Sequence, residues 1–84
     1  MEIHFSSDAW DDYLYWQATD KKIVKRINEL LKEACRTPFT GKGKPEPLRH
    51  DLQDCWSRRI DQEHRMVYRA DATTLTVFAL RFHD

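Results

Sequence analysis

An amphipathic segment in the first half of the chain constrains the fold most strongly. Its apolar residues recur at helical spacing, at Ile23, Ile27, Leu30, Leu31 and Ala34. Lysine, arginine and glutamate fill the other positions, so one stripe must be buried while the rest faces water. The pattern predicts a helix that begins after a cap at Thr19-Asp20.

A shorter helix is predicted before this cap. Ala9, Tyr13 and Trp16 share one helical face, and the serines and aspartate of residues 6–8 offer side-chain oxygens for the N-cap. Because only Thr19-Asp20 separates the two segments, they are expected to form an antiparallel helical hairpin. We expect the tryptophans at such periodic positions, Trp10, Trp16 and Trp56, to lie in the core.

The other apolar segments favour strands around one loop. Residues 2–6 alternate as an opening strand, and residues 36–47 contain every glycine and proline of the chain, which predicts a loop. The apolar period then changes to two, and three strands are predicted, at Trp56–Ile60, Arg65–Ala70 and Thr74–Phe82. The third strand is apolar on both faces and should lie inside the sheet.

These elements predict one α+β domain spanning residues 1–84. Its expected order is β-α-α-β-β-β, with two N-terminal helices packed on one face of a mostly antiparallel sheet. No stretch approaches the roughly 20 apolar residues of a membrane helix, and the N-terminus lacks the plan of a signal peptide. Cys35 and Cys55 are expected to be reduced packing residues of a cytoplasmic protein, and the histidines and cysteines lack zinc-ligand spacing.

Charge is distributed unevenly along a chain whose formal net charge is zero. Residues 1–20 hold five acidic side chains and no lysine or arginine, whereas residues 36–69 hold eight basic side chains against five acidic ones. This polarity permits one basic face. Scattered, solvated charges would produce the same totals, so the distribution alone does not decide between them.

Strand connectivity is expected to gather several polar residues at one end of the sheet. Arg65 opens one strand and His83 closes the next, so antiparallel pairing brings them to the same end. Arg81 lies two residues from His83 and should share its face, and Arg59 lies across the turn from Arg65. Glu46, between two prolines, enters the sheet region from the loop.

This set of residues suits RNA cleavage by the substrate's own 2′-hydroxyl group. Glu46 can remove the hydroxyl proton, His83 can protonate the leaving 5′-oxygen, and Arg65 and Arg59 can hold the phosphate. No metal or other cofactor is required, because the nucleophile belongs to the substrate. Each residue also has an ordinary interpretation as a surface side chain, and the cluster gains weight only from the topology that gathers it.

Other polar residues give weaker signals. Lys42 and Lys44 flank a glycine in the loop and suit non-specific attraction to phosphate. His50 could contact RNA, although a structural role is the simpler interpretation. His4 and His64 have no evident partner in the sequence.

The chain resembles a known protein family over its whole length. It is similar to the YoeB family within the RelE-like toxins, on the segments Trp10–Trp16, Ile27–Leu30, Arg36–Phe39, Gly41–Leu48, Trp56–Ile60 and Glu63–Tyr68. The resemblance implies a fold like that of microbial ribonucleases and RelE. It also implies a toxin that enters the ribosomal A site and cuts mRNA there, leaving a cyclic phosphate and a 5′-hydroxyl.

The resemblance further implies residue roles and partners. Glu46 matches the general base, Arg65 the stabiliser of the phosphate, and His83 the general acid, while Arg59 and Arg49 match supporting basic positions. The implied partner is a YefM-type antitoxin whose disordered tail folds over the toxin. Homodimers are also implied, and operator DNA is expected to be bound only through the antitoxin in the complex.

The last residue departs from the family pattern. The family usually ends His-Tyr, whereas this chain ends His83-Asp84. The two negative charges of Asp84 are expected to raise the pKa of His83 and to repel the substrate phosphate. Asp84→Tyr is therefore expected to increase mRNA cleavage in a ribosome-dependent assay, and unchanged cleavage would contradict an attenuating role for Asp84.

Two other functions fit the same features. One is a non-cleaving protein that inhibits translation by occupying the ribosome, or an attenuated toxin that mainly binds its antitoxin. The other is a housekeeping RNA-binding domain, which would not need a carboxylate among its arginines. The presence of Glu46, Arg65 and His83 favours the enzyme.

Overall fold

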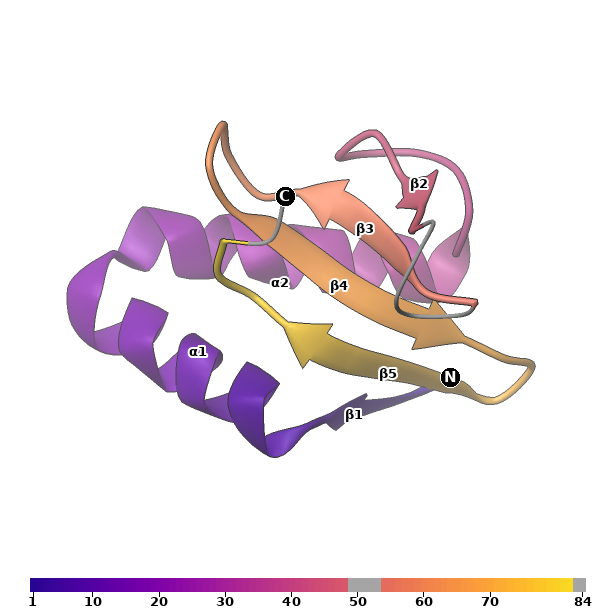
Figure 1. Ribbon diagram of the computed structural model, residues 1–84, viewed down its shortest axis with the longest axis horizontal. Helices are drawn as coiled ribbons and strands as arrows, with labels where there is room; N and C mark the ends of the chain where they lie inside the picture. Colours follow the sequence, from indigo (N-terminus) through magenta and orange to yellow (C-terminus); the bar gives the residue numbers. More distant parts are fainter. Residues whose placement is uncertain (49–53, 83–84) are drawn as a thin grey trace.

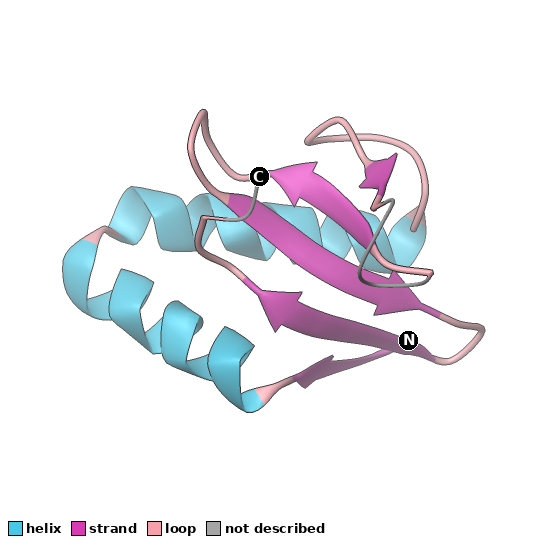
Figure 2. Cartoon of the chain, viewed as in Figure 1, coloured by secondary structure: helices cyan, strands magenta, loops and turns pink. Residues whose placement is uncertain are grey.

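The computed structural model describes residues 1–48 and 54–82 of the chain. Within these residues the elements follow the order β1 (Glu2–Phe5), α1 (Ser7–Thr19), α2 (Lys21–Arg36), β2 (Glu46–Pro47), β3 (Trp56–Arg59), β4 (Arg65–Ala70) and β5 (Thr74–Ala79). Both helices lie on one side of a twisted sheet (Figure 1), and a long loop joins α2 to β2 (Figure 2). The predicted α+β class is confirmed.

Side-chain caps define where the two helices begin. Ser6 caps α1, because its Oγ accepts a hydrogen bond from the backbone N–H of Ala9 at 3.1 Å. Asp20 ends α1 and caps α2, where its Oδ1 accepts from the N–H groups of Lys22 and Ile23. Asp20 alone separates the helices, because Thr19, which was predicted to lie in the interruption, is the last residue of α1. The predicted cap at Asp20 is confirmed. Among the described residues, neither helix is long and apolar enough to cross a bilayer.

The sheet has the strand order β1-β5-β4-β3-β2. β1 pairs with β5 in parallel, and the other neighbours are antiparallel. The predictions of a mostly antiparallel sheet and of an interior last strand are confirmed. The short strand β2 was not predicted as a strand; it lies at the sheet edge, where Pro47 can be tolerated although it has no N–H to donate.

The predicted end of the last strand was wrong. β5 ends at Ala79 rather than Phe82. The N–H of Leu80 donates to Asp12 Oδ2 and the carbonyl of Leu80 accepts from Trp16 Nε1, both at 2.9 Å. Side chains of α1 therefore take the backbone groups that would extend the strand pairing. Phe82 then adopts a positive φ of 55°, which no regular strand contains.

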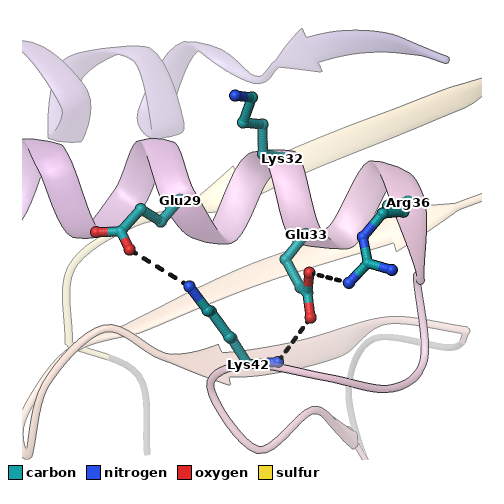
Figure 3. Close-up of a pocket in the computed structure, with 5 residues that line it drawn as sticks. All are labelled: Glu29, Lys32, Glu33, Arg36 and Lys42. Carbon is teal, nitrogen blue, oxygen red and sulfur yellow. Dashed lines mark hydrogen bonds and ion pairs between the residues drawn. The ribbon is translucent and has the colours of Figure 1, made fainter.

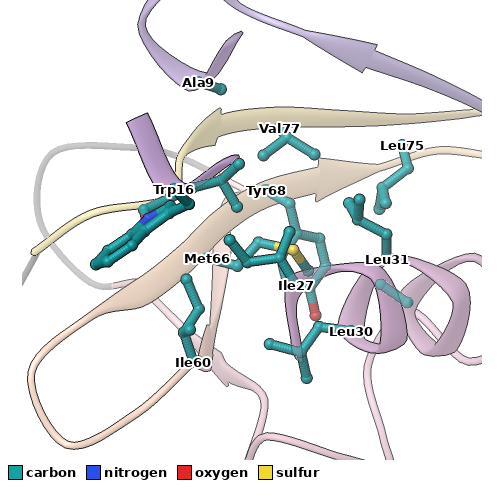
Figure 4. Close-up of a cluster of buried hydrophobic side chains, with 12 residues drawn as sticks. Ala9, Trp16, Ile27, Leu30, Leu31, Ile60, Met66, Tyr68, Leu75 and Val77 are labelled. Atoms are coloured by element: carbon teal, nitrogen blue, oxygen red, sulfur yellow. The ribbon is translucent and has the colours of Figure 1, made fainter. Parts of the chain in front are cut away.

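The core lies between the helices and the facing side of the sheet (Figure 4). Fully buried residues of α2 pack against fully buried residues of β4 and β5; they are Ile27, Leu30, Ala34, Met66, Tyr68, Leu75 and Val77. Each fully buried aliphatic side chain contributes about 1.5–3 kcal/mol to stability. Trp16 is buried as predicted, whereas Trp10 is 46% exposed, so its predicted core position was wrong. Cys35 and Cys55 are free thiols, and Cys55 is buried.

Candidate functional site

The pairing register brings Glu46, Arg59 and Arg65 onto one face of the sheet. Glu46 of β2 lies opposite Ser57 of β3, and Arg59 of β3 lies opposite Arg65 of β4. Ser57 and Arg59 are two residues apart in one strand and therefore share a face, to which their cross-strand partners also belong. Glu46 and Arg59 are thus diagonal neighbours, with Cα atoms about 7–8 Å apart. The predicted proximity of Arg59 and Arg65 is confirmed.

This face is the one opposite the helical core. Met66 and Tyr68, which alternate with Arg65 and Val67 along β4, belong to the core cluster. Arg65 and Val67 therefore point to the other side of the sheet. Glu46 and Arg59 are exposed there, so a ligand can reach both.

Arg65 is less exposed than Glu46 and Arg59 on this face. Its side chain is half-buried, and its backbone N–H donates to the carbonyl oxygen of Phe82 at 3.0 Å. Among the residues that the structure describes, its Nη1 is buried without a hydrogen-bond partner. A buried guanidinium N–H without an acceptor is costly, and an anionic oxygen is the acceptor that it binds most strongly.

The segment after β5 reaches this site at Phe82. The carbonyl of Phe82 accepts a hydrogen bond from the N–H of Arg65, so Phe82 lies beside the start of β4. His83, Asp84 and Arg49 lie outside the described residues. The predicted shared face of Arg81 and His83 therefore involves a residue outside the described part of the chain. The guanidinium of Arg81 stacks over Tyr15, 3.7 Å from the ring centroid.

Arg58 organises the loop that leads to Glu46. This side chain is fully buried. Its Nη1 donates to the carbonyl of Lys42 at 2.8 Å, its Nη2 donates to the carbonyls of Thr37 and Thr40, and its Nε donates to the hydroxyl of Tyr68 at 3.0 Å. One guanidinium therefore satisfies carbonyl groups along the whole turn of the loop. Its role was not predicted.

Tyr68 extends the same network into the core. Its hydroxyl accepts from Arg58 and donates to the carbonyl of Pro38. Burial raises the pKa of this hydroxyl, while the hydrogen bond from Arg58 opposes the rise. The neutral, donating form is therefore favoured, as the bond to Pro38 requires.

The glycines of the loop permit close packing against the sheet. Gly43 has a φ of +87°, and a Cβ atom there would lie 2.9 Å from Leu30 Cδ2 and 3.0 Å from Arg58 Cβ. Its carbonyl accepts from the N–H of Arg59 at 2.6 Å. Lys44, which was predicted to attract phosphate, is exposed and has a φ of 52°. These contacts join the loop to β3 just before Glu46.

A cavity of about 450 Å³ lies between α2 and the loop, lined by Glu29, Lys32, Glu33, Arg36 and Lys42 (Figure 3). Glu33 bonds to Arg36 at 2.6 Å and to the backbone N–H of Lys42 at 3.2 Å. The hydrogen bond from Arg36 has the largest effect in lowering the pKa of Glu33, and the hydrogen bond from the Lys42 backbone lowers this pKa further. None of the residues on the candidate face lines this cavity, so we interpret it as part of the loop's attachment to α2.

The alternation of β3 indicates that Arg58 points inward, although a charged residue is usually assigned to the surface. Arg58 alternates with the residues of the candidate face and therefore points, like Trp56, to the helical side of β3. A guanidinium on an inward position must find acceptors, and the loop carbonyls are close enough to supply them. His64 carried no comparable signal, because it lies in a turn.

Comparison with known proteins gives consistent results. Residues 5–84 match the family model described as YoeB-like toxin of bacterial type II toxin-antitoxin system. The chain is 59% identical over 83 residues to toxin YoeB of Escherichia coli K12, covering 99% of each. It superposes on a YoeB/ParE toxin from Agrobacterium tumefaciens with a TM-score of 0.95, at 49% identity and full coverage of both chains.

Structures of YoeB from Staphylococcus aureus are also similar. The chain matches the YoeB dimer with a TM-score of 0.95 and 45% identity, covering 100% of this chain and 98% of that one. It matches YoeB in a heterotetrameric YoeB-YefM complex with a TM-score of 0.91, also at 45% identity and with the same coverage.

Proposed function

The chain belongs to the YoeB-like toxins of bacterial type II toxin–antitoxin systems, and we propose that it is a ribosome-dependent endoribonuclease that cuts mRNA in the A site. The observation that carries this proposal is the placement of Glu46, Arg59 and Arg65 on one face of the sheet. A carboxylate on the same face as two guanidiniums suits a reaction in which a proton leaves a hydroxyl near a phosphate.

In the proposed reaction the chain supplies acid, base and cations. Glu46 takes the proton of the 2′-hydroxyl, whose oxygen attacks the adjacent phosphorus. The bond to the 5′-oxygen breaks, His83 protonates that oxygen, and the products are a 2′,3′-cyclic phosphate and a 5′-hydroxyl end. Arg65 and Arg59 stabilise the charge on the phosphorane. The partly buried guanidinium of Arg65, which lies opposite the exposed Arg59, supports its role as a phosphate ligand.

We also infer that the ribosome supplies much of the substrate positioning. The formal net charge of the chain is zero, so long-range attraction to free RNA is weak. Glu46 and Arg59 are exposed, and neither lines the cavity described above. An mRNA segment already held in the A site would meet these exposed side chains directly. Lys44 and Arg49 would add attraction to the backbone phosphates.

The proposed partners follow from the relatives. S. aureus YoeB forms a dimer and a heterotetrameric complex with YefM. We propose that this chain likewise binds a YefM-type antitoxin and can form homodimers, and that operator DNA is bound through the antitoxin. The proposed site of action is the cytoplasm, where ribosomes and mRNA are present.

Primer extension on a translated mRNA with purified ribosomes tests the activity. We expect wild-type protein to create new ends at A-site positions, and Glu46→Gln and His83→Ala each to reduce cleavage by more than about tenfold through loss of acid–base catalysis. Glu2→Gln is the matched control, because Glu2 lies in β1 at the opposite edge of the sheet from Glu46.

Ribosome stalling without new mRNA ends would contradict the proposal. If neither Glu46→Gln nor His83→Ala changed that stalling, the protein would inhibit by occupancy, as a non-cleaving ribosome-binding inhibitor. Equal loss of cleavage in Glu2→Gln would instead indicate a general effect of removing a carboxylate. Only selective loss in the two site variants supports the assigned roles.

A further inference from the structure

We propose that His64 is a positioning residue that fixes the end of the chain for catalysis. The inference rests on the proposed function, in which residue 83 acts as the general acid. It deepens that function by identifying the side chain that holds the backbone immediately before residue 83.

Two consecutive residues hold Phe82 from both sides of its backbone. His64 Nδ1 accepts a hydrogen bond from the N–H of Phe82 at 2.8 Å, and the N–H of Arg65 donates to the carbonyl of Phe82 at 3.0 Å. The turn between β3 and β4 and the segment after β5 lie at the same end of the sheet (Figure 1). Because Nδ1 accepts, a neutral His64 carries its proton on Nε2.

The imidazole of His64 is itself held rigidly. His64 is 8% exposed, and its ring lies edge-on to Trp16, with centroids 4.8 Å apart and an interplanar angle of 78°. Its backbone N–H donates to Asp61 Oδ1 at 2.7 Å, and its carbonyl accepts from the N–H of Ile60 at 2.9 Å. Because both the ring and the backbone of His64 are held in place, its Nδ1 can define the position of Phe82.

The conformation of Phe82 requires such support. Its φ of 55° lies in the left-handed region, which is unfavourable for a residue with a Cβ atom. Its ring is 51% exposed, so burial of the side chain contributes little to holding it. The Phe82 N–H donates to His64, and the Phe82 carbonyl accepts from Arg65. These hydrogen bonds and the packing of the His64 and Phe82 rings, whose centroids lie 4.8 Å apart, hold this conformation.

A purely structural role for His64 makes a different prediction. If the imidazole only filled space beside Trp16, an apolar ring would replace it and cleavage would be unchanged. If the acceptor atom positions the chain end, loss of that atom should lower the rate of the chemical step. Misplacement of an acid by about 1 Å can cost about 100-fold in rate.

Three substitutions separate shape from hydrogen bonding. His64→Phe keeps an aromatic ring and removes the acceptor. His64→Asn keeps an acceptor near the position of Nδ1, and His64→Leu matches the shape of asparagine without it. The control is His4→Phe, since His4 is exposed in β1 at the far edge of the sheet.

Two measurements are made on each folded protein. Hydrogen–deuterium exchange by NMR reports protection of the Phe82 amide, and single-turnover primer extension at saturating ribosome reports the cleavage rate. We expect His64→Phe and His64→Leu to exchange this amide at least about tenfold faster. They should cleave about 10- to 100-fold more slowly with unchanged ribosome affinity. His64→Asn should stay within about threefold of wild type in both, because it keeps the acceptor.

The outcomes distinguish this inference from the proposed function. Wild-type cleavage that persists in His64→Phe and His64→Leu would overturn the inference alone. Equal losses in His64→Asn and His64→Leu would also overturn it, because the acceptor would then have no effect. If wild-type protein produced no mRNA ends, the proposed function would fail and the catalytic role with it. If His64→Phe did not fold, the asparagine and leucine pair would make the same comparison.

Discussion

Arg65→Lys is expected to lower the rate of mRNA cleavage by about 10²–10³-fold, the usual loss on removing a preorganised donor from a developing anion. The guanidinium presents a planar pair of N–H groups to a phosphate, whereas an ammonium presents a point charge. Arg65 is half-buried beside Phe82, so lysine cannot shift freely to recover the second contact. Single-turnover primer extension with saturating ribosome measures this loss in the chemical step.

Arg69→Lys is the matched control for this prediction. Arg69 occupies the same strand and face as Arg65, about 13 Å along β4, and its guanidinium lies 5.2 Å from the ring centroid of Phe78. The same chemical change there should alter cleavage by less than about threefold, because weak attraction to the RNA backbone does not depend on bidentate geometry. Equal losses in the two variants would mean that total positive charge, rather than the position of Arg65, supports cleavage.

Elements whose pattern is local were predictable from the sequence. The apolar stripe of α2 specifies its buried face, and Asp20 marks its start by offering a side-chain oxygen to the first free N–H groups. The antiparallel order of β3 and β4 then determines that Arg59 lies opposite Arg65. Only short sequence separations and the alternation of strands are needed for these conclusions.

Features that depend on distant side chains were not predictable in this way. Residues 80–82 continue an apolar pattern, but β5 ends because Trp16 and Asp12, which lie 64 and 68 residues earlier, bond to Leu80. The acceptor role of His64 likewise depends on Phe82, 18 residues later. Tertiary hydrogen bonds of this kind override the local apolar pattern, and that pattern alone does not reveal them.

The same distinction applies to the candidate site. The sequence predicted that Arg59 and Arg65 lie together, because the register of β3 and β4 decides this. It placed Glu46 only near the sheet, because β2, which pairs Glu46 with Ser57, was not predicted as a strand. It did not predict what fixes Glu46, because that depends on a loop whose carbonyls converge on a buried guanidinium from the neighbouring strand. The residues proposed to do the chemistry were thus easier to find than Arg58, which holds the loop before Glu46.

Arg58→Met is expected to lower the free energy of unfolding by about 3 kcal/mol, within the range for breaking a buried charged hydrogen-bond network. Methionine can fill part of the space, but it donates no hydrogen bond. The carbonyls of Thr37, Thr40 and Lys42 would each lose a donor, and the hydroxyl of Tyr68 would lose one partner. Urea denaturation followed by tryptophan fluorescence measures the change.

Arg59→Met separates this structural effect from loss of phosphate binding. Arg59 is the next residue in β3 and is exposed, so the substitution should change the free energy of unfolding by no more than about 0.5 kcal/mol. Its cleavage rate should nevertheless fall, because Arg59 faces the proposed substrate. Arg58→Met should lose both stability and cleavage, since a released loop no longer holds Glu46 beside Arg59. A fully stable Arg58→Met protein would show that backbone packing alone holds the loop, and the guanidinium would then have no role in placing Glu46.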